Sequence, residues 1–182
     1  MMRQTWFWMA AGAALWAAVA FAAQAGKLPA RLTVTSPDFS NGGTIPRKCT
    51  CTGGDLSPAL TWSGLPPEAR SIVVICDDPD APGGTWVHWV LYDLPATERG
   101  LPAGVLPHSP LPGGALQGMN GWNRTGYGGP CPPPGKPHRY FFKVYALDAP
   151  LALGPGASKI QVLAAMRDHV LAMGELMGTF GR

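Results

Sequence analysis

The chain is organised around the stretch Ser71-Ile-Val-Val-Ile-Cys-Asp-Asp-Pro-Asp-Ala-Pro82, followed at once by Gly83-Gly-Thr-Trp-Val-His-Trp-Val-Leu-Tyr92. The apolar run from Ile72 to Cys76 is typical of a strand that is buried on both faces. This strand must stop at the prolines, because proline fixes φ and donates no backbone hydrogen bond. The two glycines let the chain turn back into a second strand, Trp86 to Leu91, which contains His88. Acidic residues at the end of one central strand and an imidazole on the next predict the wall of a site.

The N-terminal residues are typical of a secretory signal peptide. Arg3 supplies a positive charge, Trp6 to Phe21 is an apolar run, and Ala23-Gln-Ala25 fits a small-residue cleavage site. The apolar run is short for a membrane-spanning helix. We therefore expect residues 1–25 to be removed and the mature chain, starting at Gly26, to be periplasmic or secreted.

Residues 26–182 are long enough for a single domain with its own core. Loss of the leader removes one of the 14 basic residues and none of the 11 acidic ones, so the net charge stays small. Such a charge gives no argument for nucleic-acid binding.

Two further segments carry clear secondary-structure patterns. His138 to Leu147 alternates like a strand, with His138, Tyr140, Phe142 and Val144 on one face. A helix is expected from the N-cap Ser158 to Gly178. Its apolar stripe is expected to consist of Ile160, Leu163, Val170, Met173 and Met177.

The rest of the chain has the pattern of short strands and turns. Short strands are expected at Leu32 to Val34 and after Ser57-Pro58, the latter ending near Trp62. Ala96 to Gly118 is rich in proline and glycine and shows no period, so it is expected to be a long loop. Gly121 to Gly135 has a similar composition, and its aromatic residues indicate a packed loop. Many strands and one C-terminal helix predict a mainly β, sandwich-like domain.

Metal binding is not supported by the spacing of the acids. Asp78-x-Asp80 begins like a calcium loop, but Pro82 offers no side-chain ligand and Trp89 stands where the bidentate glutamate should be. A zinc site would need four side chains to converge without a His-x-x-x-His spacing to support it. These four are Asp78, Asp80, His88 and His138.

A hydrolase site is a second interpretation of the same residues. No Gly-x-Ser-x-Gly nucleophile elbow is present. Cys131 and His138 can be drawn as nucleophile and base, but a disulfide is the more natural fate of Cys131 in an exported protein. Asp78 and Asp80 could share a proton, although their spacing does not show that both face one cavity.

A binding pocket fits these residues best. Gly128-Gly-Pro-Cys131 can present the backbone N–H groups of Gly129 and Cys131 as an anion nest. His88 and His138 can donate hydrogen bonds to phosphate or carboxylate. Tyrosine hydroxyl groups and proline rings can complete the walls.

Four motifs in this order resemble the phosphatidylethanolamine-binding protein family, and within it the bacterial Raf-kinase-inhibitor-like proteins. The motifs are Asp78-Pro-Asp-Ala-Pro82, Trp86-Val-His88, Gly129-Pro-Cys-Pro-Pro133 and His138-Arg-Tyr140. The resemblance runs from about Leu32 to Arg182. It implies a large central antiparallel sheet packed by a second, smaller sheet, with the C-terminal helix alongside.

The resemblance also implies a function and a set of pocket residues. It implies a non-enzymatic binding protein for a small anionic ligand, with no cofactor, and a hydrolase that uses the same pocket stays the alternative. A kinase or protease partner, peripheral contact with a lipid headgroup and a homodimer are further implications. The matching pocket residues are Asp78, Asp80, Pro82, His88, Tyr127, Cys131, Pro132, His138 and Tyr140.

Four cysteines lie after the leader, and they allow three complete pairings. Cys76 sits in the apolar strand and is expected to be a buried thiol. Bacterial relatives often have cysteines at the places of Cys51 and Cys131, so the resemblance favours that disulfide. Cys49 replaces an aromatic residue of the relatives, which leaves a Cys49–Cys131 bridge open.

Carboxylates in an anion-binding pocket would repel the ligand, so the acidic residues are expected to have another role. We expect Asp78 to accept a hydrogen bond from a histidine or a loop amide and to hold it in place. His88 should share a strand face with Trp86, Val90 and Tyr92, and the glycine turn would then bring it to Asp78. A nearby carboxylate would raise the pKa of His88, and burial would oppose this.

Overall fold

The computed structural model describes residues 29–107 and 111–182, so the expected leader and the expected start at Gly26 lie outside the described residues. Strands make up most of the regular structure in these ranges, which confirms the mainly β class. Within the same ranges, no helix is long and apolar enough to cross a membrane.

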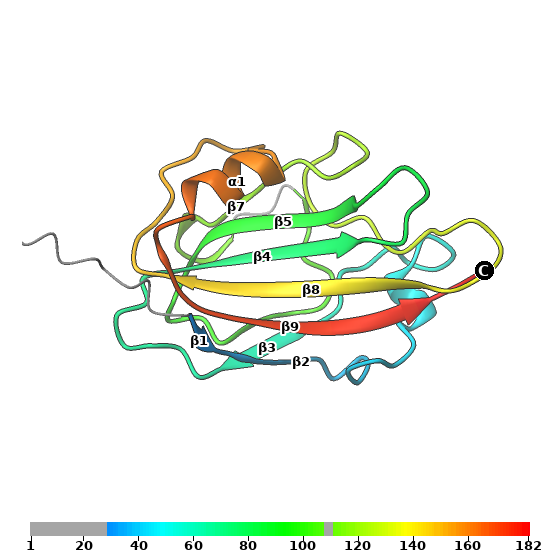
Figure 1. Cartoon of the computed structure of the whole chain (residues 1–182), viewed down its shortest axis with the longest axis horizontal. Coiled ribbons are helices and arrows are strands. Elements are labelled where there is room, and N and C mark those ends of the chain that lie inside the picture. The colour runs from blue at the N-terminus through cyan, green and yellow to red at the C-terminus, as the bar shows by residue number, and fades with distance from the viewer. Residues whose placement is uncertain (1–28, 108–110) are drawn as a thin grey trace, which may run out of the picture.

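A six-stranded sheet forms the centre of the molecule (Figure 1). Its strand order is β1 (Ala30–Arg31), β9 (Val170–Phe180), β8 (His138–Leu147), β4 (Ser71–Asp78), β5 (Trp86–Pro95) and β7 (Leu116–Gln117). All neighbouring strands are antiparallel except the short β1, which pairs with β9 in parallel. The expected antiparallel sheet is thus mixed at one edge.

A second sheet has three strands, β2 (Thr33–Thr35), β3 (Leu60–Ser63) and β6 (Gly100–Leu101). The smaller sheet confirms the two-sheet architecture. Two short 3-10 helices, η1 (Arg47–Cys49) and η2 (Pro112–Gly114), lie in the connections. The expected loop Ala96–Gly118 is therefore only partly irregular, because it contains β6, η2 and β7.

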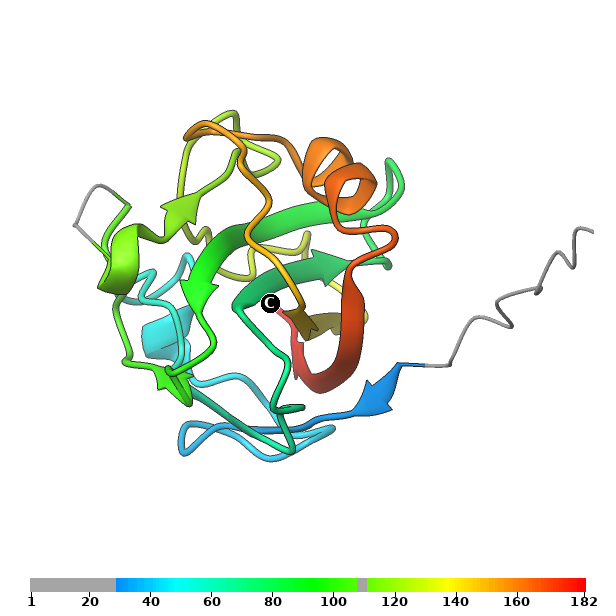
Figure 2. The ribbon, with the colours of Figure 1, turned by 90° about the vertical axis from the view of Figure 1, so that its left-hand side faces the viewer.

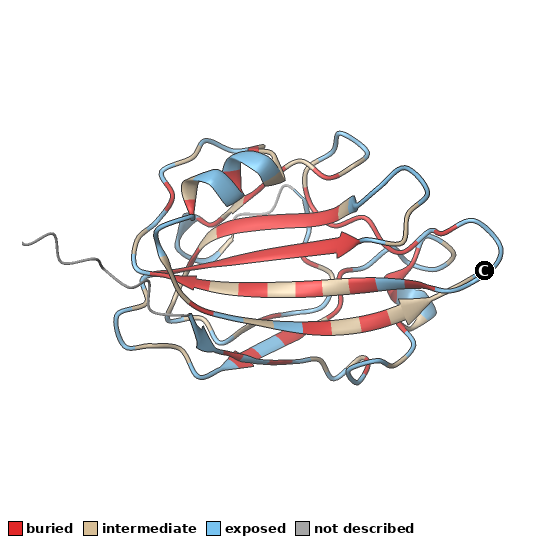
Figure 3. Ribbon diagram, in the orientation of Figure 1, coloured by how far each residue is buried: buried red, intermediate tan, exposed pale blue. Residues whose placement is uncertain are grey.

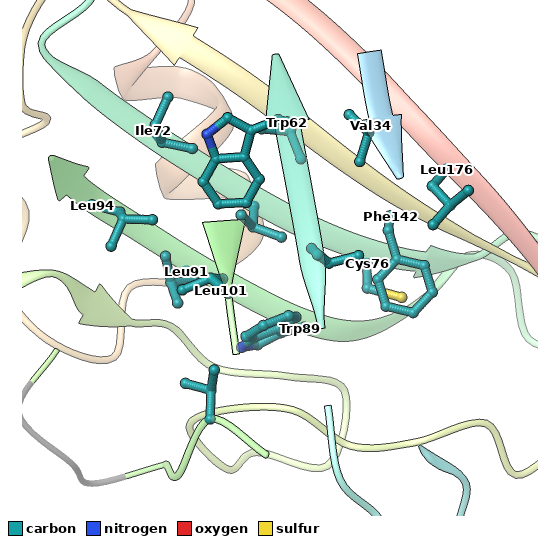
Figure 4. Packing of buried hydrophobic residues seen from close by; sticks show 14 of the residues in the cluster. Val34, Trp62, Ile72, Cys76, Trp89, Leu91, Leu94, Leu101, Phe142 and Leu176 are labelled. Atoms are coloured by element: carbon teal, nitrogen blue, oxygen red, sulfur yellow. The ribbon is translucent and has the colours of Figure 1, made fainter. Parts of the chain in front are cut away.

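Every residue of β4 is buried, as its continuous apolar run predicts (Figure 3). Ile72, Val74 and Cys76 belong to the core cluster that also contains Trp62 of the small sheet (Figure 4). Val73 and Ile75 point to the other face and belong to a second cluster with Val162 of the helix. The two faces of β4 therefore meet different layers of the domain.

The second layer on the large sheet is α1 (Lys159–Ala165), which lies on the side away from the small sheet (Figure 2). Ser158 is its N-cap, as predicted, and it forms a capping box with Gln161. The expected apolar stripe is wrong, because Ile160 is 79% exposed and the helix buries Val162 instead.

The expected helix is also too long, because Val170–Phe180 is strand β9 and not helix. β9 pairs with β8 from His138↔Phe180 to Leu147↔Val170. Gly174 and Gly178 disfavour a helix, and Ala172, Leu176 and Gly178 are buried on one face with a strand period. Pairing with a long neighbouring strand outweighs the accidental helical spacing of the apolar residues.

Candidate functional site

A cavity of about 340 Å³ opens where β4, β5 and β8 meet the loops 81–85 and 131–133. Six of the predicted pocket residues line it, together with seven others. The predicted six are Asp78, Pro82, His88, Cys131, Pro132 and His138, and the others are Ala81, Gly83, Gly84, Thr85, Trp86, Trp122 and Pro133.

His88 reaches this cavity because β5 has a bulge. Cys76 of β4 pairs with Trp89, whereas the next residue, Asp77, pairs with Val87, so His88 is the extra residue. A bulge re-aims side chains beside a site. His88 consequently lines the same cavity as Trp86, while Val90 and Tyr92 face the helix. The expected common face of His88 with Val90 and Tyr92 is therefore wrong.

The His88 ring is buried and held by a backbone carbonyl. Its Nδ1 atom lies 2.6 Å from the carbonyl oxygen of Gly128, and an oxygen of this kind can only accept, so Nδ1 donates. Nε2 is then the ring nitrogen left for a ligand. Burial lowers the pKa of His88, whereas the Gly128 carbonyl and the nearby Asp78 act to raise it. The effect of burial is the larger one, so the pKa of His88 falls below its ordinary value instead of rising.

Asp78 holds the other histidine. Its Oδ2 atom lies 2.8 Å from Nδ1 of His138, and its Oδ1 atom accepts a hydrogen bond from the backbone N–H of Asp80 at 2.8 Å. The expected role of Asp78 as an acceptor for a histidine and a loop amide agrees with this geometry, but its partner is His138 and not His88. His138 and Asp78 are both buried, so the hydrogen bond is shielded from water.

Strand alternation separates the two adjacent acids. Asp78 continues the face of Cys76 and reaches the cavity, whereas Asp77 continues the face of Ile75. The Asp77 carboxylate is buried there between Lys143 of β8, at 3.1 Å, and Lys159 of α1, at 2.7 Å. Asp77 therefore ties the helix to the sheet and takes no part in the cavity.

Asp80 does not line the cavity, although it was predicted to. The Arg139 guanidinium binds it with two side-chain hydrogen bonds, of 2.9 and 2.7 Å. This contact lowers the pKa of Asp80 to about 2. The pair lines a neighbouring groove together with Lys136, so Asp80 and Arg139 lie outside the cavity.

The two predicted tyrosines lie behind the cavity wall. Tyr127 is buried and donates a hydrogen bond to the carbonyl oxygen of Cys49 at 2.8 Å. Tyr140 packs edge-on against His88 with ring centroids 5.1 Å apart. Its buried hydroxyl has no hydrogen-bond partner within 29–107 and 111–182. Burial, and then the charge of Asp78, raise the pKa of Tyr140.

The loop that contains Cys131 is fixed by a disulfide between Cys51 and Cys131. This confirms the favoured pairing, and Cys49 and Cys76 are buried free thiols. The expected anion nest is only half available, because the Gly129 N–H donates to the Asp55 carboxylate at 2.6 Å. The disulfide was also the fate expected for Cys131 over a nucleophilic role, and its sulfur is bonded to Cys51.

An aromatic rim at the mouth was missed by the sequence reasoning. Trp86 and Trp122 are each 37% exposed, and their rings meet edge to face at 5.3 Å. Each ring lies on a glycine: a Cβ atom at Gly121 would come within 2.4 Å of Trp86, and one at Gly128 within 2.5 Å of Trp122. Large aromatic residues in a Gly/Pro-rich loop (Trp122) and directly after one (Trp86) are the signal that could have revealed this rim.

The chemistry of the cavity follows from its charges. Among the residues that the structure describes, no lysine or arginine lines it. In the same part of the chain, no three histidine, cysteine or acidic side chains converge as metal ligands. The cavity can therefore bind an anion or a hydroxyl group through the Nε2 atoms of its two histidines.

Comparison with known proteins places this geometry in a wider group. The family model described as phosphatidylethanolamine-binding protein matches residues 35–181. A UPF0098 protein of Methanothermobacter thermautotrophicus is 50% identical over 144 residues, which cover 79% of this chain and 95% of that protein. A UPF0098 protein of Aquifex aeolicus is 46% identical over 153 residues, 83% of this chain and 89% of that protein.

Two solved structures are similar over nearly their whole length. One is CT736 of Chlamydia trachomatis, described as a putative phosphatidylethanolamine-binding protein homologue, with a TM-score of 0.77 and 41% identity over 84% of this chain and 98% of that chain. The other is YbcL of E. coli, described as a new member of the mammalian family, with a TM-score of 0.78 and 36% identity over 84% of this chain and 99% of that chain.

Proposed function

Because the chain belongs to the phosphatidylethanolamine-binding protein family, we propose that it is an exported binding protein that holds a small anion in the cavity and catalyses no reaction. The anion is phosphate, a phosphorylated headgroup or a carboxylate. The family resemblance adds a protein partner, a kinase or a protease that the protein inhibits or modulates. The disulfide supports an oxidising compartment such as the periplasm.

The observation that carries the proposal is that the two histidines are held by equivalent hydrogen bonds. His88 and His138 each use Nδ1 for a fixed acceptor, the carbonyl of Gly128 and the carboxylate of Asp78. Each ring is thereby oriented and has only Nε2 left for a ligand. Both rings line one cavity, so two ring nitrogens from different strands are available to one small group.

Proton uptake should accompany the binding of an anion. The lowered pKa of His88 means that its ring is neutral near pH 7. A neutral Nε2 accepts a hydrogen bond, whereas a protonated one donates to an anion with the added strength of its charge. An anion that binds at Nε2 of His88 therefore needs a proton on His88 or on the ligand, and binding should strengthen as the pH falls toward the lowered pKa of His88.

A hydrolase remains the second candidate, and one contact favours it. The Asp78 carboxylate orients His138, as a carboxylate orients the histidine base of many hydrolases. A water molecule would have to be the nucleophile, since Cys131 is in a disulfide. Turnover of an ester, phosphate or peptide substrate by the purified protein would establish this alternative.

Calorimetry tests the binding proposal. Inorganic phosphate, phosphoethanolamine and acetate are titrated into the protein between pH 5 and 8, chosen to span the ordinary range of histidine. His88→Ala should weaken binding by about 1.5–3 kcal/mol, the value of a charge-assisted hydrogen bond. His169→Ala is the control, because His169 pairs with Asp148 on the exposed surface. Thermal melts show that the variants are folded.

Two results would contradict the proposal. His88→Ala that binds as tightly as the unmodified protein would show that the cavity is not the anion site. Binding that strengthens steadily above neutral pH would show that protonated histidine plays no part.

A further inference from the structure

A second cleft, of about 680 Å³, is larger than the histidine cavity. Three segments form its walls: residues 54–57, residues 104–107, and Met119 together with residues 123–125. Tyr127 is the remaining lining residue, and its hydroxyl is already committed to the Cys49 carbonyl. None of the lining residues belongs to the histidine cavity.

Apolar side chains come from all three walls of this cleft. Leu56 and Leu106 lie in two different walls and are 43% and 60% exposed, which is unusual for leucine in this chain. Val105, Pro107 and Met119 extend the apolar lining. Exposed apolar residues that gather in a hollow mark a binding site more often than single exposed residues do.

One cation in the cleft is available to a ligand. The Arg124 guanidinium lies 5.9 Å from the ring centroid of Trp122 and forms no ion pair with any acid in the described parts of the chain. Asp55 also lines the cleft, and its carboxylate accepts a hydrogen bond from the Gly129 N–H at 2.6 Å and forms no ion pair with Arg124. The cleft therefore pairs an apolar surface with a guanidinium that has no ion-pair partner in the described parts of the chain, and a guanidinium is the group best suited to bind carboxylates and similar anions.

Hydrogen bonds to a buried side chain hold the loop that contains Arg124. Asn120 is buried, and its Oδ1 atom accepts hydrogen bonds from the backbone N–H groups of Trp122, at 3.0 Å, and of Arg124, at 3.3 Å. Its side-chain amide donates to the carbonyl oxygen of Gly126 at 3.0 Å. A preorganised loop lowers the entropy that binding costs.

We propose that this cleft is a second ligand-binding site, which takes a small amphipathic molecule with an apolar body and one carboxylate or sulfonate group. The body lies between Leu56 and Leu106, and the anionic group lies against Arg124. The volume supports a small molecule, because ligand pockets in proteins are typically about 300–1,000 Å³ and are mostly apolar with a few placed polar groups.

The cleft is in physical contact with the first site, and this decides which residues can be tested. Asp55 holds Gly129, and the neighbouring Gly128 holds His88. A change at Asp55 would therefore disturb both sites. Leu106 and Arg124 come from two different wall segments of the cleft and do not themselves line the histidine cavity, so they are the residues to change; Arg124 lies beside Trp122, which does line that cavity.

Titration with anilinonaphthalene sulfonate, a fluorescent aromatic sulfonate, tests the proposal on the purified chain. We expect saturable binding that Leu106→Asp and Arg124→Glu each weaken about tenfold or more, the loss typical of a charged contact. Ile160→Asp and Arg167→Glu are matched controls on and after α1, both exposed, and should bind normally. Residues 1–28, which include the apolar run Trp6 to Phe21, are common to all variants and cannot cause a difference between them.

Three results would overturn the proposal. The first is no saturable binding by the unmodified chain. The second is equal loss in the cleft variants and in the controls, or no loss in either cleft variant while thermal melts show intact folds. The third is a dimer in sedimentation that Leu106→Asp dissociates, which would make the cleft an interface between two copies of the chain.

Discussion

The Nδ1 atom of His138 lies 2.8 Å from the Oδ2 atom of Asp78, although the two residues are 60 positions apart in the chain. They meet because β4 and β8 are neighbours in the sheet and both side chains lie on the face toward the small sheet. The acid at the end of the central strand thus orients the histidine of β8, while a backbone carbonyl orients His88.

Asp78→Asn should weaken phosphate binding by about 1.5–3 kcal/mol, because His138 loses its charged partner and its fixed orientation. Asp80→Asn is the matched control, since Asp80 pairs with Arg139 outside the cavity and should leave phosphate affinity unchanged. Calorimetry on both variants at one pH measures the difference. Equal losses would show that Asp78 has no special role in orienting His138.

The stability of the protein should depend on the protonation of His88. Burial lowers the pKa of His88 below its ordinary value of 6.5, so the unfolded chain binds a proton that the folded chain does not. The contribution of His88 to the free energy of unfolding is therefore complete above pH 6.5 and is lost as the pH falls from 6.5 toward the folded pKa. Urea denaturation at several pH values, in the unmodified protein and in His88→Gln, should show this loss only in the unmodified protein. An NMR titration that places the pKa of His88 above 6.5 would refute the prediction.

Removal of the disulfide should destabilise the domain and loosen one wall of the cavity. Cys51 and Cys131 are separated by 80 residues, and the chain-entropy model assigns about 4 kcal/mol to a closure of this length. The double variant Cys51→Ser/Cys131→Ser should unfold at lower denaturant concentration and bind phosphate more weakly, because Cys131 lines the cavity. Unchanged unfolding curves after full reduction of the native protein would contradict this expectation.

The two free cysteines should be inert in the folded protein. Burial raises the pKa of the Cys49 thiol to about 11 and that of Cys76 well above its ordinary value. The thiolate is the reactive form, so iodoacetamide at pH 8 should modify neither residue until the chain is unfolded. Mass spectrometry would then find both modified. Rapid labelling of Cys49 in the folded state would show that its surroundings open.

The sequence by itself determined those elements whose signals lie within a short stretch of the chain. The apolar run of β4, the alternation of β8 and the N-cap Ser158 all agree with the structure. These patterns are reliable because burial on both faces, burial on one face and helix capping each impose a period or a residue type on the chain itself. The order of the four motifs was enough to indicate the family, its two-sheet fold and the cavity that most of the predicted site residues line.

Only the tertiary structure decided which residues meet. The bulge that turns His88 into the cavity depends on the register of β5 against β4, and no local signal in β5 reveals it. The partner of Asp78, the pairing of Asp80 with Arg139 and the strand conformation of β9 depend on contacts with β8 that are distant in the chain. Local periodicity cannot distinguish such contacts, because the free energy that selects them comes from pairing and burial between segments the sequence keeps far apart.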